Sequence, residues 1–127
     1  MPNVCINGLS IEGPEADLSE CLEAIREGDI PLSFQKVQPP PTDVDADLWR
    51  SNKWGTDREG WDFAVKRSPG RVDMGFATSW SPPEGVILHL SRRFFSLAFT
   101  LEWEQPEPPE TGTLVCRNGV VVLRETT

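Results

Sequence analysis

Hydrophobic and polar positions change their period twice in one central stretch of the chain. Apolar side chains fall at every second position over residues 72–78, which predicts a strand with one buried face. Over residues 86–94 they follow the spacing of one helix face, and over residues 97–103 the two-residue period returns. The pattern therefore predicts a strand, a helix and a strand in succession.

The start of this central helix has its own local signals. Ser81 is interpreted as the N-cap and Pro82 as the first helical residue, where the missing N–H has no partner to lose. Glu84 follows Ser81 by three residues and completes a capping box. The sequence predicts a helix that begins at Pro82.

The N-terminal part predicts a strand and then an amphipathic helix. Apolar residues alternate over residues 4–11, with a slip at Asn7-Gly8 that we interpret as a β-bulge. A helix is predicted to open after Pro14 and to end at Gly28. Its apolar face comprises Leu18, Cys21, Leu22 and Ile25.

The region that follows predicts a second strand and a short helix. Residues 30–37 are interpreted as a strand that the prolines at 39–41 bring to an end. Residues 44–50 are interpreted as a helix that turns Leu48 and Trp49 inward.

The C-terminal half predicts two hairpins. Residues 61–65 alternate and are joined to the central strand by a turn at 68–70. Residues 105–110, rich in proline, are interpreted as an exposed linker. A second hairpin is predicted around Asn118-Gly119, a strong two-residue turn signal.

These elements predict one domain over residues 1–127. The chain is 38% hydrophobic, enough for a core of its own. Helices flanked by strands favour an α+β fold: a two-layer sandwich with an antiparallel or mixed sheet, two helices on one face and a C-terminal β-hairpin.

Cysteine usage and hydropathy bear on the compartment. Cys5, Cys21 and Cys116 are an odd count without metal-ligand spacing, so we predict reduced, buried thiols. No stretch resembles a signal peptide or a membrane span. A soluble, cytoplasmic protein is expected.

The net charge of −8 is concentrated in the first third of the chain. Residues 1–47 contain ten acidic and two basic residues, whereas residues 48–127 contain ten of each. Glu20, Glu23 and Glu27 are predicted to form a stripe opposite the apolar face of the first helix. The acidic residues that surround this stripe are Glu12, Glu15, Asp17 and Asp29. Two interpretations remain open: a solvated helix face, or a surface that binds a basic partner.

Candidate chemistry is sparse. His89 is the single histidine, and no cysteine or carboxylate is spaced as a co-ligand for a metal. We therefore expect no catalytic residue, metal or cofactor. Trp54 and Trp80 are interpreted as structural anchors beside glycine and proline corners, or as a secondary binding site that stacks on a ligand.

Short motifs resemble one known family. Trp54-Gly55-Thr56 and the run from Trp80 to Pro83, together with the N-terminal Met1-Pro2-Asn3 and residues 34–41, resemble the YubB / Api92-like proteins. The resemblance implies a ferredoxin-like domain in an accessory protein of plasmids or phages, with no established catalytic residues. Residues 57–61 depart from the family pattern, and the acidic first helix lies outside it.

These observations lead to three functional hypotheses. The first is a non-enzymatic, anti-CRISPR-like inhibitor that binds a host protein complex through its acidic surface, as a nucleic-acid mimic, and is expected to be a monomer in a bacterial cytoplasm. The second is a single-stranded nucleic-acid binder that uses the sheet face. The third is a small enzyme. Direct nucleic-acid binding would require a basic footprint, so the first hypothesis is favoured.

Overall fold

The computed structural model describes residues 3–127, so Met1 and Pro2 of the N-terminal Met1-Pro2-Asn3 motif lie outside the described residues. Over residues 3–127 the chain forms six strands and four helices, whereas two helices on the sheet and a short helix over residues 44–50 were expected. In chain order they are β1 (Val4–Glu12), α1 (Glu15–Ile25), α2 (Phe34–Val37), α3 (Ala46–Lys53), β2 (Trp61–Ser68), β3 (Arg71–Ser79), α4 (Glu84–Arg93), β4 (Ala98–Pro106), β5 (Pro109–Arg117) and β6 (Val120–Thr126). None of the helices in this described range is long and apolar enough to cross a membrane.

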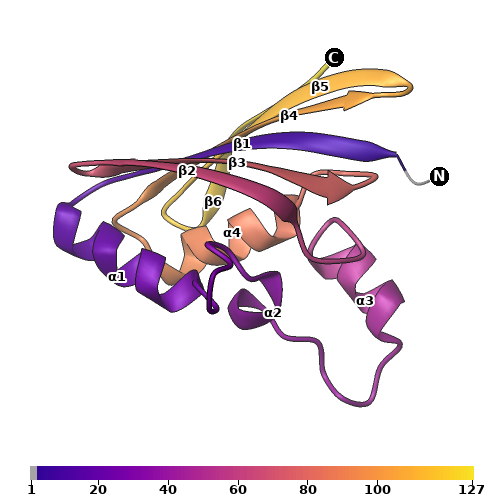
Figure 1. Ribbon diagram of the computed structural model, residues 1–127, viewed down its shortest axis with the longest axis horizontal. Helices are drawn as coiled ribbons and strands as arrows, with labels where there is room; N and C mark the ends of the chain where they lie inside the picture. The colour runs from indigo at the N-terminus through magenta and orange to yellow at the C-terminus, as the bar shows by residue number, and fades with distance from the viewer. Residues whose placement is uncertain (1–2) are drawn as a thin grey trace.

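The six strands of the described chain form one antiparallel sheet in the order β2-β3-β1-β4-β5-β6. β1 lies in the interior because it pairs with β3 on one side and with β4 on the other. Figure 1 shows the helices together on one side of this sheet. We call that side the helix-covered face and the other side the open face.

The interior strand β1 explains the slip in the sequence pattern. Its pairing with β3 is continuous along its whole length, so the predicted bulge is wrong. Instead, the polar residue Asn7 points into the core and the apolar Ile6 lies exposed on the open face. The amide of Asn7 donates to Thr78 Oγ1 at 2.9 Å and to the Cys5 carbonyl at 3.3 Å. These bonds compensate for removing the amide from water.

The strand predicted over residues 30–37 is wrong, since this segment contains the one-turn helix α2. Ser33 caps α2 with its hydroxyl group. The side chain of Glu59 accepts hydrogen bonds from the backbone N–H of Phe34 at 2.7 Å and of Gln35 at 2.9 Å. A carboxylate distant in sequence thus satisfies the N–H groups that a helix start leaves unpaired.

The helix predicted over residues 44–50 is present as α3. The Asp45 side chain caps it by accepting a hydrogen bond from the Leu48 N–H at 3.2 Å. Trp49 is half-buried against the core, as predicted, but Leu48 is 62% exposed. Adjacent helical residues point about 100° apart, so a helix that contacts the core along one side buries only one of them.

α4 begins two residues later than its predicted start. Pro83 is its N-cap and no side chain caps it, so the predicted capping box is wrong. The Ser81 hydroxyl donates instead to the Gly55 carbonyl. The N–H of Gly85 donates to the Trp54 carbonyl at 3.0 Å. The loop after α3 therefore provides the contacts that a local capping box would have made.

The C-terminal third is a meander of β4, β5 and β6. Residues 105–110 are no linker, because β4 and β5 remain paired up to Pro106 opposite Pro109. The hairpin around Asn118-Gly119 is confirmed, and both residues have the positive φ angles that this turn requires. The hairpin between β2 and β3 is confirmed as well.

Candidate functional site

The acidic residues of the first third lie on and around α1. Glu15 and Asp17 occupy its first turn, where the helix dipole favours negative charge, and Glu20 and Glu23 are exposed farther along. The helix ends at Ile25, so Glu27 lies in the following turn and does not extend the stripe as predicted. There it accepts a hydrogen bond from the Ser33 hydroxyl at 3.0 Å.

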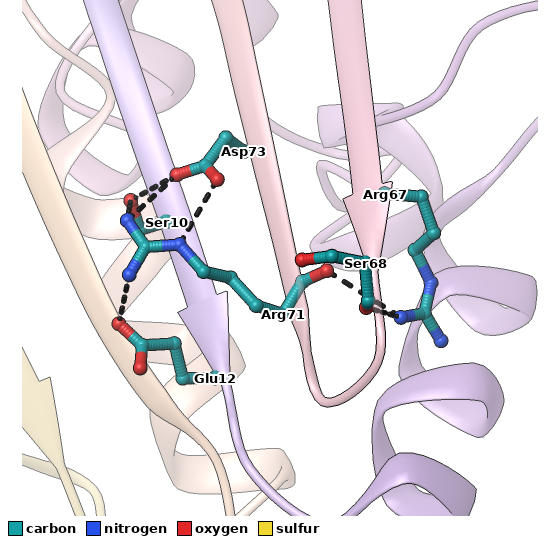
Figure 2. Close-up of polar contacts among 6 residues, drawn as sticks. All are labelled: Ser10, Glu12, Arg67, Ser68, Arg71 and Asp73. Atoms are coloured by element: carbon teal, nitrogen blue, oxygen red, sulfur yellow. Dashed lines mark hydrogen bonds and ion pairs between the residues drawn. The ribbon is translucent and has the colours of Figure 1, made fainter.

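Glu12 belongs to a separate ionic network on the open face. Figure 2 shows the guanidinium of Arg71 held between Asp73, Ser10 and Glu12. Its Nη1 lies 2.8 Å from Glu12, its Nε lies 2.9 Å from Asp73, and its Nη2 lies 3.2 Å from the Ser10 hydroxyl. The hydrogen bonds from Arg71 lower the pKa of Asp73 below its usual value. Glu12 is therefore engaged within the molecule.

Glu15 is engaged as well, because it joins the start of α1 to the β2–β3 hairpin. Its carboxylate accepts a hydrogen bond from the Arg67 guanidinium and one from the Gly70 N–H at 2.7 Å. Both bonds lower the pKa of Glu15, and the bond from Arg67 has the larger effect. Its negative charge thus has a structural role in fixing α1 against the sheet.

Four of the predicted residues remain as an acidic group at the surface, in which Glu20, Glu23 and Asp29 are exposed and Asp17 is half-buried. Among residues 3–127, Asp17, Glu20 and Asp29 form no ion pair with a basic side chain. Glu23 pairs with Arg26 at 3.0 Å, a surface contact that also lowers the pKa of Glu23. We call Asp17, Glu20, Glu23 and Asp29 the α1 acidic surface.

The α1 acidic surface adjoins an exposed aromatic side chain. Asp17 and Glu20 border a hollow together with Arg93 and Phe95. Arg93 is the last residue of α4, and Phe95 lies two residues after it. Phe95 is 62% exposed. Sequence reasoning missed this residue, although it breaks the helical spacing of the apolar face of α4 and directly follows Phe94.

The two candidate tryptophans differ. Trp54 is buried, with its ring edge-to-face against Phe34 at 5.6 Å and its Nε1 donating to the Gln38 carbonyl at 2.8 Å. Trp80 is 49% exposed and has a left-handed backbone, with φ 68°. Because about half of the Trp80 side chain is exposed, the interpretation of Trp80 as a buried anchor is wrong. Trp54 fits that interpretation.

The open face of the sheet carries acids, small residues and two basic side chains, Lys66 and Arg71, the second of which is paired with Glu12 and Asp73. Gly8 of β1 lies opposite Gly75 of β3 and opposite Glu102 of β4. Glu104 and Glu125 border the same trough. Among the strand aromatics that base stacking would need, Phe76, Phe99 and Trp103 are buried in the core. On the edge strand β2, Phe63 packs partly buried against the core and Trp61 is half-buried. This arrangement provides no support for nucleic-acid binding on the open face.

The potential nucleophiles lie in apolar surroundings. Burial raises the pKa of Cys5 to about 11 and that of Cys21 to about 12, and it raises the pKa of Cys116. His89 is half-buried, and its pKa is lowered mainly by desolvation and, to a smaller extent, by the positive charge of the nearby Arg93. Because the thiolate is the reactive form of cysteine, these thiols are chemically quiet near neutral pH.

The three thiols are expected to resist alkylation in the folded protein. At pH 8 a thiol with the raised pKa of Cys5, about 11, is ionised in only about one molecule in a thousand, and all three side chains are buried. Iodoacetamide should leave the native chain unmodified in intact-mass spectra, whereas a sample in guanidinium chloride should gain three adducts. Rapid modification of one native cysteine would contradict this and would identify a reactive site.

Comparison with known proteins agrees with this architecture. A family model described as the ferredoxin-like domain in Api92-like protein matches residues 60–124. The crystal structure of protein api92 from Yersinia pseudotuberculosis is similar with a TM-score of 0.77, covering 100% of this chain and 98% of that chain at 10% sequence identity. No curated protein sequence matches the chain.

The sheet order and these matches define a ferredoxin-like α+β domain. Within this class, the chain belongs to the Api92-like family. At 10% identity the structural likeness shows the fold alone, so the role of the α1 acidic surface must be argued from this chain.

Proposed function

We propose that this protein is a non-enzymatic inhibitor that binds a nucleic-acid-binding host protein through the α1 acidic surface. The observation that carries the proposal is the hollow that the exposed Phe95 shares with Asp17, Glu20 and Arg93. A carboxylate stripe alone is a common solvated feature. An exposed aromatic ring beside it adds an apolar anchor of the kind that protein interfaces bury.

The charge of this surface indicates a basic partner. A groove that holds nucleic acid presents lysine and arginine to phosphates, and carboxylates at similar positions occupy it as a mimic of the polyanion. The proposed setting, a plasmid or phage, follows from the resemblance to YubB-like proteins. The proposed target, a CRISPR effector or a similar defence complex, is a nucleic-acid-binding complex of the kind that an acidic surface fits. The high thiol pKa values and the desolvated His89 support a non-enzymatic role.

A charge reversal with a matched control tests the proposal. The triple variant Glu20→Lys, Glu23→Lys and Asp29→Lys should associate with a purified CRISPR effector complex about tenfold or more slowly than the wild type, because electrostatic steering is reversed. It should also lose inhibition of guide-directed DNA cleavage. The wild-type association rate should fall as salt rises. Biolayer interferometry and a cleavage assay measure these effects.

The control is the triple variant Glu102→Lys, Glu104→Lys and Glu125→Lys, which changes the net charge equally but on the open face. It should retain inhibition, and thermal melts should show both variants folded. Equal loss in both variants would mean that net charge alone is responsible. Full activity of the α1 variant would leave the α1 acidic surface as a solvated face and refute the proposal.

A further inference from the structure

The two edges of the sheet are built differently. β2, at one edge, carries Asp62, Lys66 and Arg67 and has a register shift in its pairing with β3. Charges and bulges are the usual devices that keep an edge strand from pairing with another chain. β6, at the other edge, begins with four consecutive apolar residues at 120–123. β6 also has a register shift in its pairing with β5, and it carries Arg124 and Glu125 in its second half. Its apolar first half, residues 120–123, is therefore the part of an edge strand that no charge protects.

The apolar residues of β6 are exposed on both sides of the strand. Val120 is 55% exposed and Val122 is 54% exposed, while Val121 and Leu123 are each 39% exposed. A solvated edge strand normally alternates with polar residues, and an exposed run of this length is a defect unless it has a function. β6 also pairs with β5 alone among the strands described over residues 3–127, so its outward N–H and C=O groups are available.

We propose that β6 is a dimerisation edge that pairs antiparallel with β6 of a second copy of this chain, so that the sheet continues from one subunit into the next. Unpaired backbone groups in a row are satisfied by another extended strand. That strand must offer apolar side chains on both of its faces, and β6 itself has this property. A two-fold axis gives each copy the same self-complementary patch.

The charge distribution favours a second copy at this edge. Residues 112–123, which form most of the β5–β6 hairpin, contain Arg117 as their only charged residue. Arg124 lies 3.5 Å from Glu84 of the same chain and is thereby partly neutralised. Two copies, each with a net charge of −8, repel elsewhere but meet here without opposing like charges. The proposed dimer differs from the monomer expected from the sequence, and it does not depend on the proposed function.

Sedimentation velocity over a concentration series tests this pairing. A single strand pair is a small interface, so we expect a dimer with a dissociation constant in the micromolar range, about 1–100 µM. The Val122→Lys variant should weaken association by about tenfold or more, because each subunit would place an ammonium group in the apolar seam. Mixing it with Val122→Glu should restore a heterodimer.

The matched control is Val65→Lys on β2, since Val65 is 48% exposed on the opposite edge. It should dimerise as the wild type does. A second readout needs no variant: hydrogen exchange of the amides at 120–126 should slow as the wild-type concentration rises. A wild type that stays monomeric at 1 mM, about tenfold above the expected range, would overturn the proposal. So would a dimer that survives Val122→Lys and is lost in Val65→Lys.

Discussion

Replacing Gly85 with alanine is expected to lower the free energy of unfolding by about 3 kcal/mol or more. A Cβ at this position would lie 1.7 Å from the Lys53 carbonyl oxygen and 3.1 Å from the Trp54 carbonyl carbon. Both are backbone atoms, so no side chain can move aside and the α3 and α4 ends must separate. Urea denaturation and a melting temperature lowered by roughly 10 °C would measure the effect.

Gly8→Ala is the matched control, because it makes the same chemical change in an open place. The nearest atom to a Cβ there would be the Glu102 carbonyl oxygen at 3.9 Å, an ordinary contact. Both variants lose the same glycine entropy in the unfolded chain, so their difference isolates the native contact. Gly8→Ala should be neutral or stabilising by up to about 1 kcal/mol. Similar stability of the two variants would show that α3 and α4 do not pack this closely.

Trp54→Ala is expected to destabilise the domain by about 3–5 kcal/mol, the range for truncating a large buried aromatic side chain. The ring is 1% exposed, contacts Phe34 and Trp49 edge-to-face, and donates to the Gln38 carbonyl. Its removal leaves a cavity and an unpaired acceptor. Chemical denaturation measures the loss, and Trp54→Phe separates the hydrogen bond, worth about 1 kcal/mol, from the packing.

Trp80→Ala provides the comparison on an exposed ring. Because 49% of Trp80 is exposed, its truncation should change the free energy of unfolding by less than about 1 kcal/mol. The motif around each tryptophan resembles the same family, so sequence alone assigned both rings the same role. A loss at Trp80 as large as at Trp54 would show that the Trp80 ring is packed in solution and would contradict its 49% exposure.

Several elements could be predicted because their signals are local. Period-two alternation marks β3 and β4, since a strand with one buried face repeats every two residues. Helical spacing marks α1 and α4, and Asn118-Gly119 marks the last turn. The position of the negative charge in the first third also follows from the sequence alone.

The remaining features depend on partners far apart in the chain. α2 is helical because Glu59 completes its start, and Asn7 points inward because Thr78 satisfies its amide. Neither partner can be recognised from neighbours in sequence. Ser81 likewise fails as a cap because its hydroxyl bonds to Gly55.

The candidate site shows the same division. Sequence determined that acidic residues gather around the first helix, because composition and helical spacing are properties of the chain itself. Only the tertiary structure decided which of them are available: it pairs Glu12 with Arg71 and Glu15 with Arg67, and it brings Phe95 beside Asp17. An ion pair depends on distance in space, and that distance exists only after the β2–β3 hairpin has packed against β1 and α1.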